Sequence, residues 1–372
     1  MKNLLAAIIL SSFSICAAAQ GENYGFVDSR ALQIPFTETN STTALATYIQ
    51  ANFTTEREKL RAAYTWIANN IQYNRDSMFY RYWGEDPERK LSSVLKTRKG
   101  VCENFASLLA VIASKCGIPA YVVNGYTKVN GFVNWMGHSW CAVSLNKEWF
   151  FCDPTWDYNF KTDANYFLIE PASFVSTHMP FDPIWQLLEQ PVTIKEFKQG
   201  YTKGKGNPAY NYKDSITAFL QADTLVQMEG FSRRMKKAGI ENDDLRTWYA
   251  YNEMKIFIVQ QEKDMNRFNA SVRDLNSAKI LFNDFVQYRN NHMSPPRPDV
   301  EVNRLFNAVD SLLTAAYKKL DEVGKTVENF QYDTDGLKLN LDVLSAKVQL
   351  QKGFLKRYFA VGLAEREKLL YE

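Results

Sequence analysis

The stretch GVCENFASLLAVIASKCGIPAYVVNGY, residues 100–126, contains a change of hydrophobic period that decides the fold. Behind Cys102, small and apolar residues recur at the spacing of one helix face, namely Phe105, Ala106, Leu109, Ile112 and Ala113. Gly117 and Pro119 end this pattern, because glycine favours the position just past a helix and proline cannot continue one. The β-rich run that follows predicts a strand over residues 119–129.

Cys102 stands at the head of the predicted helix, and three identities fit it there: a small buried thiol, half of a disulfide, or a nucleophile. Unpaired backbone N–H groups and the positive end of the helix dipole stabilise a thiolate at this position. Gly100 would let the backbone turn tightly and leave room for a substrate. The N–H of Cys102 would also point toward a carbonyl under attack and contribute to an oxyanion hole. The helix start therefore favours the nucleophile.

Two further strands, residues 138–145 and 148–156, are predicted to form a hairpin around a two-residue turn. In that register Cys141 lies directly opposite Cys152. The two could form a cross-strand disulfide or remain buried thiols, and the strain of a direct cross-strand bridge favours thiols.

The other face of the hairpin offers a base for the cysteine. Trp140 lies opposite Asp153, and His138 is two residues away on the same face, so the side chains of His138 and Asp153 can meet. Diagonal neighbours of this kind are about 7–8 Å apart at the backbone. The other histidines are less suited, since His178 is predicted in a loop and His292 in a proline-rich connection.

Residues 1–19 have the pattern of a secretory signal peptide. Lys2 precedes an apolar run, and an A-x-A site ends at Ala19. We therefore expect an exported protein, periplasmic or secreted, with no later segment apolar enough to span a bilayer. Cys16 could instead carry a lipid, but the bulky residue before it does not suit such a site.

Export permits disulfides among the four cysteines that remain. Cys116, near the end of its predicted helix, is most simply a core residue. A bridge from Cys116 to Cys102 stays open as an alternative that would disarm the site.

The composition is that of a globular protein, with 46% hydrophobic residues. Lys and Arg total 44 and Asp and Glu total 41, which leaves a net charge of +3. Because the charge is nearly balanced, it does not favour nucleic acid or an anionic membrane as the main partner.

The chain divides into a core over residues 20–198, a linker over 199–214 and a helical bundle over 215–372. A T-x-x-E capping box at Thr55 and Glu58 predicts the start of an amphipathic helix in the core. Clustered glycines and a proline mark the linker. Two apolar stripes predict an antiparallel bundle after it, and their members are Leu305, Val309, Leu312, Ala316 and Leu320, then Leu337, Leu341, Leu344, Val348 and Leu355.

Several of these features together resemble the transglutaminase-like superfamily of papain-type thiol enzymes. The family pattern has a Gly-x-Cys at a helix start, a GIPA-V-GY strand, a His-x-Trp strand and an Asp-x-Thr-Trp strand end. This chain matches it with Gly100 and Cys102, residues 117–126, His138 and Trp140, and Asp153 and Trp156. The resemblance covers roughly residues 55–160.

The resemblance implies an α+β papain-like core, with the cysteine-bearing helix against an antiparallel sheet, followed here by an all-α domain. It implies that Cys102 is the nucleophile, His138 the general base and acid, and Asp153 the residue that orients the imidazole. Papain carries a glutamine as oxyanion donor six residues before its cysteine, where this chain has Lys96, so that donor is absent.

Four residues are candidates for binding substrate: Gly100, Trp83, Trp140 and Trp156. Each also has a structural explanation, since Gly100 suits a tight turn and the tryptophans could be core or surface residues.

The resemblance implies amide acyl transfer through a thioester, without a cofactor. Water as acceptor would make the protein a peptidase or amidase, and an amine would make it a transglutaminase. Acidic calcium loops like those of animal cross-linking enzymes are absent between residues 21 and 205, which favours hydrolysis without an obligatory metal. We expect a protein or peptide amide as substrate, with cell-envelope material as one source. A catalytically silent binding module stays open, with the C-terminal helices as a site for a protein partner.

Overall fold

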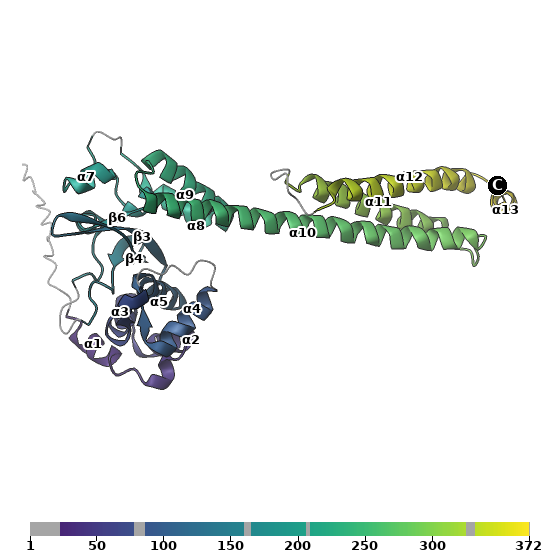
Figure 1. Ribbon diagram of the computed structural model, residues 1–372. Coiled ribbons are helices and arrows are strands. Elements are labelled where there is room, and N and C mark those ends of the chain that lie inside the picture. Colours follow the sequence, from purple (N-terminus) through teal and green to yellow (C-terminus); the bar gives the residue numbers. More distant parts are fainter. Residues whose placement is uncertain (1–22, 78–85, 160–164, 206–208, 325–331, 372) are drawn as a thin grey trace, which may run out of the picture. The chain divides into compact units, whose positions relative to one another are not determined.

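The computed structural model describes residues 23–77, 86–159, 165–205, 209–324 and 332–371 (Figure 1). The predicted signal peptide lies outside these ranges. The chain divides into two compact units, one of residues up to Gln221 together with Arg233–Thr247, and the other of Ala222–Ser232 together with the residues from Trp248 onward. The boundaries expected for the linker stay a prediction.

Helices build the first part of the first unit. They are α1 (Gly25–Ala31), α2 (Thr42–Asn52), α3 (Glu56–Asn70), α4 (Pro87–Thr97) and α5 (Cys102–Lys115), with short 3-10 turns at Phe36–Thr39 and Arg75–Ser77. The predicted capping box at Thr55 and Glu58 is confirmed, since each side chain accepts the backbone N–H of the other residue. Helix α4 was not anticipated, although Asp86 caps it and proline opens it as helix-start rules require.

A four-stranded antiparallel sheet follows, in the order β5-β4-β3-β6. Its strands are β3 (Ala120–Val129), β4 (Phe132–Leu145), β5 (Glu148–Cys152) and β6 (His178–Pro180). A separate parallel pair joins β1 (Gln72–Tyr73) to β2 (Lys99–Gly100). Helices and an antiparallel sheet in one unit confirm the α+β class for the core.

The β4–β5 hairpin has the predicted register, with Cys141 opposite Cys152 and Leu145 opposite Glu148. Both turn residues, Asn146 and Lys147, have positive φ angles of 52° and 69°, as a type I′ turn requires. The four cysteines among the described residues are free thiols.

Three parts of the sheet differ from the prediction. Strand β5 ends at Cys152 and not at residue 156, because the chain turns after Asp153, whose Oδ1 accepts the N–H groups of Thr155 and Trp156.

Strand β4 begins at Phe132 and not at residue 138, because a tight turn at Asn130-Gly131 pairs it with β3 from its first residue. The prediction that His178 lies in a loop is wrong, since it opens β6 and pairs with Thr127.

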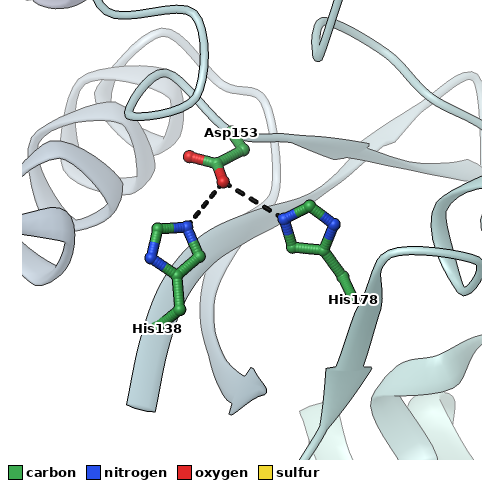
Figure 2. Close-up of side chains that lie close together, drawn as sticks. All are labelled: His138, Asp153 and His178. Atoms are coloured by element: carbon green, nitrogen blue, oxygen red, sulfur yellow. Dashed lines mark hydrogen bonds and ion pairs between the residues drawn. The ribbon is translucent and has the colours of Figure 1, made fainter. Parts of the chain in front are cut away.

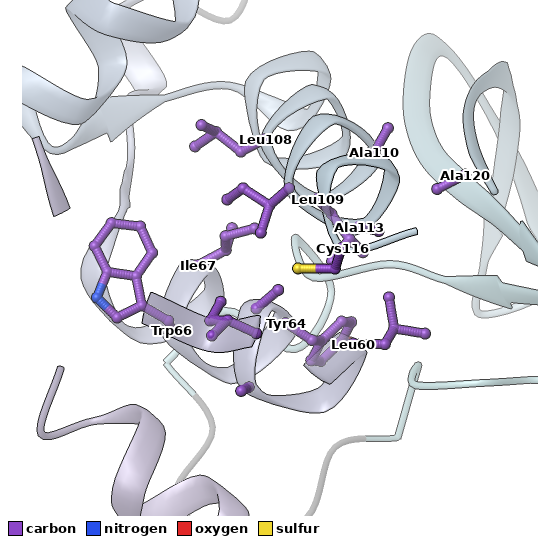
Figure 3. Close-up of a cluster of buried hydrophobic side chains, with 14 of the residues drawn as sticks. Leu60, Tyr64, Trp66, Ile67, Leu108, Leu109, Ala110, Ala113, Cys116 and Ala120 are labelled. Carbon is purple, nitrogen blue, oxygen red and sulfur yellow. The ribbon is translucent and has the colours of Figure 1, made fainter. Parts of the chain in front are cut away.

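Helix α5 packs between the sheet and the helices α2 and α3. Figure 3 shows side chains of α3 and α5 that meet in this core, among them Leu60, Ile67 and Leu109. Cys116 is buried in the same cluster, which agrees with the core role predicted for it. The core therefore holds the start of α5, and with it Cys102, against the sheet.

The opposite face of the sheet is covered by residues that come later in the first unit. Trp140 and Phe151 of the sheet pack there with Phe174, Trp185 and Ile216. The elements on this side are α6 (Pro171–Phe174), the 3-10 turn Pro183–Gln186 and α8 (Tyr212–Gln221). The short helix α7 (Ile194–Lys198) contributes Phe197 to a separate cluster with Val175, Met179 and Val192.

The second unit is all α-helical, as predicted. Its helices are part of α9 (Thr224–Ala238) and most of α10 (Asp243–Asn290), then α11 (Asp299–Asp321), α12 (Thr334–Phe359) and α13 (Leu363–Leu369). Both predicted stripes lie in its core or pack against it. Over the described ranges, none of the helices combines the length and the apolar character needed to cross a membrane.

Gly125 of β3 lies between two neighbouring strands. It pairs with His138 of β4 on one side and with Pro180 of β6 on the other. A Cβ atom here would lie 2.1 Å from the carbonyl oxygen of Met179 and 2.5 Å from the indole of Trp140. Only glycine therefore allows β6 to approach β3 at this point.

We expect Gly125→Ala to destabilise the first unit by about 1–3 kcal/mol, the usual cost of forcing an extra methyl group into a packed site. The free energy of unfolding, followed by tryptophan fluorescence in denaturant, would measure this. Gly353→Ala is the matched control, since a Cβ there meets no heavy atom within 4 Å and the helix α12 should gain stability. Equal stability of Gly125→Ala and wild type would contradict the packing argument.

Candidate active site

Cys102 is the first residue of α5, after the N-cap residue Val101, and its side chain is half-buried. Asn104 closes this helix start, because its Oδ1 accepts the N–H of Val101 at 2.9 Å. A Cβ atom on Gly100 would lie 2.8 Å from the Cβ of Asn104, so glycine is needed for the cap to form. As the first helical residue, Cys102 has a backbone N–H that the helix itself does not use.

His138 and Asp153 meet as the hairpin register predicted. His138 Nε2 lies 2.6 Å from Asp153 Oδ2, and Figure 2 shows the two side chains pointing toward each other. The second carboxylate oxygen, Oδ1, accepts the N–H groups of Thr155 at 2.9 Å and Trp156 at 3.3 Å. Asp153 is completely buried, while the side chain of His138 retains 12% of its exposure. The imidazole can therefore reach a substrate, and the carboxylate cannot.

The electrostatics of the three groups favour a thiolate–imidazolium pair. Burial raises the pKa of Cys102, but the hydrogen bond and charge of His138, with the Ser139 N–H, outweigh it and leave the pKa below its usual value. Burial opposes the imidazolium too, yet the charge and hydrogen bond of Asp153 raise the pKa of His138 to about 10. Despite burial, the two histidines hold the pKa of Asp153 well below its usual range.

His178 is a member of this cluster that the sequence reasoning missed. Its Nε2 lies 3.2 Å from Asp153 Oδ2, the same oxygen that His138 contacts (Figure 2). The residue is only 1% exposed, on a strand of three residues. A strand this short carries little alternation, so its sequence gave no periodic signal.

The proposed substrate-binding residues lie in different surroundings. Trp140 is fully buried and packs edge-on against His178, with ring centroids 5.0 Å apart. Trp156 is half-buried, with its ring centroid 6.1 Å from that of His138. Trp83 lies outside the described residues. Lys96 is exposed near the end of α4. Substrate contact for Gly100, Trp83, Trp140 and Trp156 stays a prediction.

Three of these side chains present atoms that could ligate a metal ion. The donor atoms of His138, Asp153 and His178 lie within 4.8 Å of one another. They are joined by hydrogen bonds, and a metal ion would have to replace those bonds. The expectation of no obligatory metal stays a prediction.

Comparisons with known proteins point to one family. A family model described as the transglutaminase-like superfamily matches residues 43–154. Kyphoscoliosis peptidase of Mus musculus is 28% identical over 202 residues, which cover 45% of this chain and 30% of that protein. Hillarin of Drosophila melanogaster is 24% identical over 203 residues, which cover 46% and 24%. The chain thus spans less than a third of the length of either relative.

Among solved structures, the periplasmic domain of TgpA from Pseudomonas aeruginosa is similar to part of the chain. The identity is 23% and the TM-score 0.27, over 36% of this chain and 49% of that one.

The two histidines should give the stability of the protein opposite pH dependences. Burial lowers the pKa of His178 from 6.5 to about 4, so its contribution is complete above pH 6.5 and is lost as the pH falls toward 4. The raised pKa of His138 works the other way, with a contribution that is present below pH 6.5 and lost toward pH 10.

Between pH 7 and pH 4.5 the free energy of unfolding should fall less in His178→Gln than in wild type, because glutamine does not titrate. We expect the two decreases to differ by up to roughly 3 kcal/mol. Denaturant unfolding at the two pH values would measure the difference. An equal loss in both proteins would show that His178 titrates normally in the folded state.

Proposed function

Residues 43–154 form a domain of the transglutaminase-like superfamily, and from this premise we propose that the protein is an exported thiol hydrolase. It would cleave amide bonds of proteins or peptides through a thioester on Cys102. The observation that carries the proposal is the buried His138–Asp153 hydrogen bond, next to a thiol of lowered pKa at a helix start. Export is proposed because residues 1–19 match the pattern predicted for a signal peptide.

In the first step the Cys102 thiolate attacks the amide carbonyl carbon, and the carbonyl electrons move onto the oxygen. The backbone N–H of Cys102 can donate to that oxyanion, since the helix leaves it free. The His138 imidazolium gives its proton to the nitrogen of the scissile bond, and the amine leaves. A thioester on Cys102 remains, and His138 is neutral.

In the second step neutral His138 takes a proton from water, and the hydroxide attacks the thioester carbon. The tetrahedral intermediate collapses with Cys102 thiolate as leaving group, which releases the carboxylic acid. Asp153 stays ionised throughout and stabilises the imidazolium, as its lowered pKa requires. Nε2 of His138 faces Asp153, so the proton transfers to substrate and water fall to Nδ1.

Hydrolysis is favoured over transfer by two observations. The similar mouse protein is named a peptidase. Residues 21–205 also contain no acidic loop of the calcium-binding type. The C-terminal helical unit is proposed to bind a protein partner.

Cys102 should react with iodoacetamide faster than the other three cysteines. The thiolate is the reactive form, and burial raises the pKa of Cys116, Cys141 and Cys152. Mass spectrometry of the native protein after brief labelling would compare the four sites.

His138→Gln should slow the labelling of Cys102 at pH 7 by tenfold or more, because the charge that stabilises the thiolate is lost. His292→Gln is the matched control, since His292 lies in the helical unit. Slow, equal labelling of all four cysteines would count against a catalytic thiol and favour a silent binding module.

Treating a cell-envelope protein extract with wild type or with Cys102→Ala would distinguish hydrolysis from transfer to an amine. We expect wild type alone to create new peptide termini, detected by mass spectrometry. New Gln–Lys bonds in place of new termini would identify a transglutaminase and overturn the hydrolytic assignment. No difference between the two proteins, with Cys102 reactive, would place the substrate outside that extract.

A further inference from the structure

The carboxylate of Asp153 accepts four hydrogen bonds although it is completely buried. Two come from the backbone of the next turn to Oδ1, at 2.9 Å and 3.3 Å. The other two come from His138 and His178, which share Oδ2 at 2.6 Å and 3.2 Å. The proposed proton transfers involve His138 alone, which leaves the second histidine without a role in the chemistry.

The partners of His178 determine which of its nitrogens carries a proton. An ionised carboxylate can only accept, so the proton toward Asp153 must be on Nε2. Nδ1 lies 2.8 Å from the hydroxyl of Thr177, which can donate to it. The same hydroxyl lies 3.3 Å from the carbonyl oxygen of Phe174, a longer contact. Thr177 thus stabilises the tautomer that donates to Asp153.

The surroundings of His178 favour the neutral ring. It stacks on Phe174, with centroids 3.9 Å apart and planes 18° apart. Trp156 and Trp140 enclose it, at 4.4 Å and 5.0 Å between ring centroids. Burial among these rings lowers the pKa of His178 to about 4 despite the nearby Asp153. His178 is therefore uncharged at neutral pH, unlike His138.

We propose that His178 is a positioning residue of the Cys102–His138–Asp153 triad, which holds Asp153 Oδ2 toward His138 and stabilises its charge through the Nε2–H bond. This inference rests on the proposed function, because it assigns the role to a working thiolate–imidazolium pair. The hydrogen bonds of His178 in the described residues go to Asp153 and Thr177, so it acts on the thiol through Asp153.

The hydrogen bond from His178 should shift the pH at which the Cys102 thiolate forms in one direction only. With Cys102 as thiolate, His138 as imidazolium and Asp153 as carboxylate, the triad carries one net negative charge. The N–H of an uncharged His178 stabilises that charge without adding a positive charge of its own. If the donor is removed, the triad should take up a proton more readily, so the pH at which the Cys102 thiolate forms should rise.

The other titratable groups around the triad do not obscure this effect. The tyrosines and thiols that interact with Asp153 or Cys102 have raised pKa values, through burial first, and stay neutral near pH 7; they are Tyr64, Tyr73, Tyr166, Cys141 and Cys152. Asp157 is the neighbouring carboxyl, and burial raises its pKa from 3.8. It is bound by Tyr64 and contacts neither histidine in the described structure.

The test is the rate of Cys102 alkylation by iodoacetamide between pH 4 and pH 9, followed at that residue by mass spectrometry of the full chain. The midpoint is the pH at which the alkylation rate reaches half of its maximum. We expect His178→Phe, which keeps a stacking ring but has no donor, to raise this midpoint by about one pH unit. His178→Gln should shift it less, because its amide can reach Oδ2 as Nε2 does. His292→Phe is the matched control and should leave the midpoint unchanged.

The order of the two variants separates this role from packing alone. A residue that only fills space between aromatic rings would tolerate phenylalanine better than glutamine, so a larger shift in His178→Gln would overturn the proposal. Equal midpoints in wild type and His178→Phe would overturn it too. If His178→Phe does not fold, His178→Asn replaces it, since its shorter amide reaches Thr177 but not Asp153. A wild-type midpoint at the value of an ordinary thiol, about 8.5, would instead refute the proposed function.

Discussion

A single buried carboxylate, that of Asp153, is the constraint on which the site depends. An ionised carboxylate without partners would be very costly in a place closed to water. Four donors offset that cost, and they come from β4, from β6 and from the turn after β5. The fold must therefore bring β4, β6 and the turn after β5 together at the Asp153 carboxylate. The geometry of the candidate triad follows from that arrangement.

Gly125 is the part of the sheet that permits the arrangement. It lies on β3 between His138 of β4 and Pro180 of β6, where any side chain would strike the backbone of Met179. Because β6 can approach this closely, His178 enters a ring of aromatic side chains and stays neutral. The two histidines that share one carboxylate oxygen thus differ in charge. His138, which reaches solvent and the thiol, is protonated, and His178, which aromatic rings enclose, is neutral.

Helix α5 brings the cysteine to this pair. Helix α5 is held by apolar contacts with α3 and the sheet, and its first turn is closed by Asn104 packed over Gly100. Cys116 and Cys141 line the same core and are kept as thiols by burial. One cysteine of the four is therefore set apart by its place at a helix start and by the charge of His138.

Local patterns in the sequence were sufficient for α5, its glycine stop, the β4–β5 hairpin and the meeting of His138 with Asp153. Each of these depends on residues close together in the chain, where period, turn type and register act directly. The length of β4 was missed although its Asn130-Gly131 turn is a strong hairpin signal. Helix α4 was missed although Asp86 and Pro87 are helix-start signals.

The sequence by itself determined the cysteine-bearing helix and the hairpin, and with them the three residues of the candidate triad. Only the tertiary structure decided the position of His178. Its strand has three residues, and its place comes from pairing with β3 some fifty residues earlier in the chain. Short-range periodicity cannot report such a contact, because the stabilising partners are the buried charge of Asp153 and the space left by Gly125.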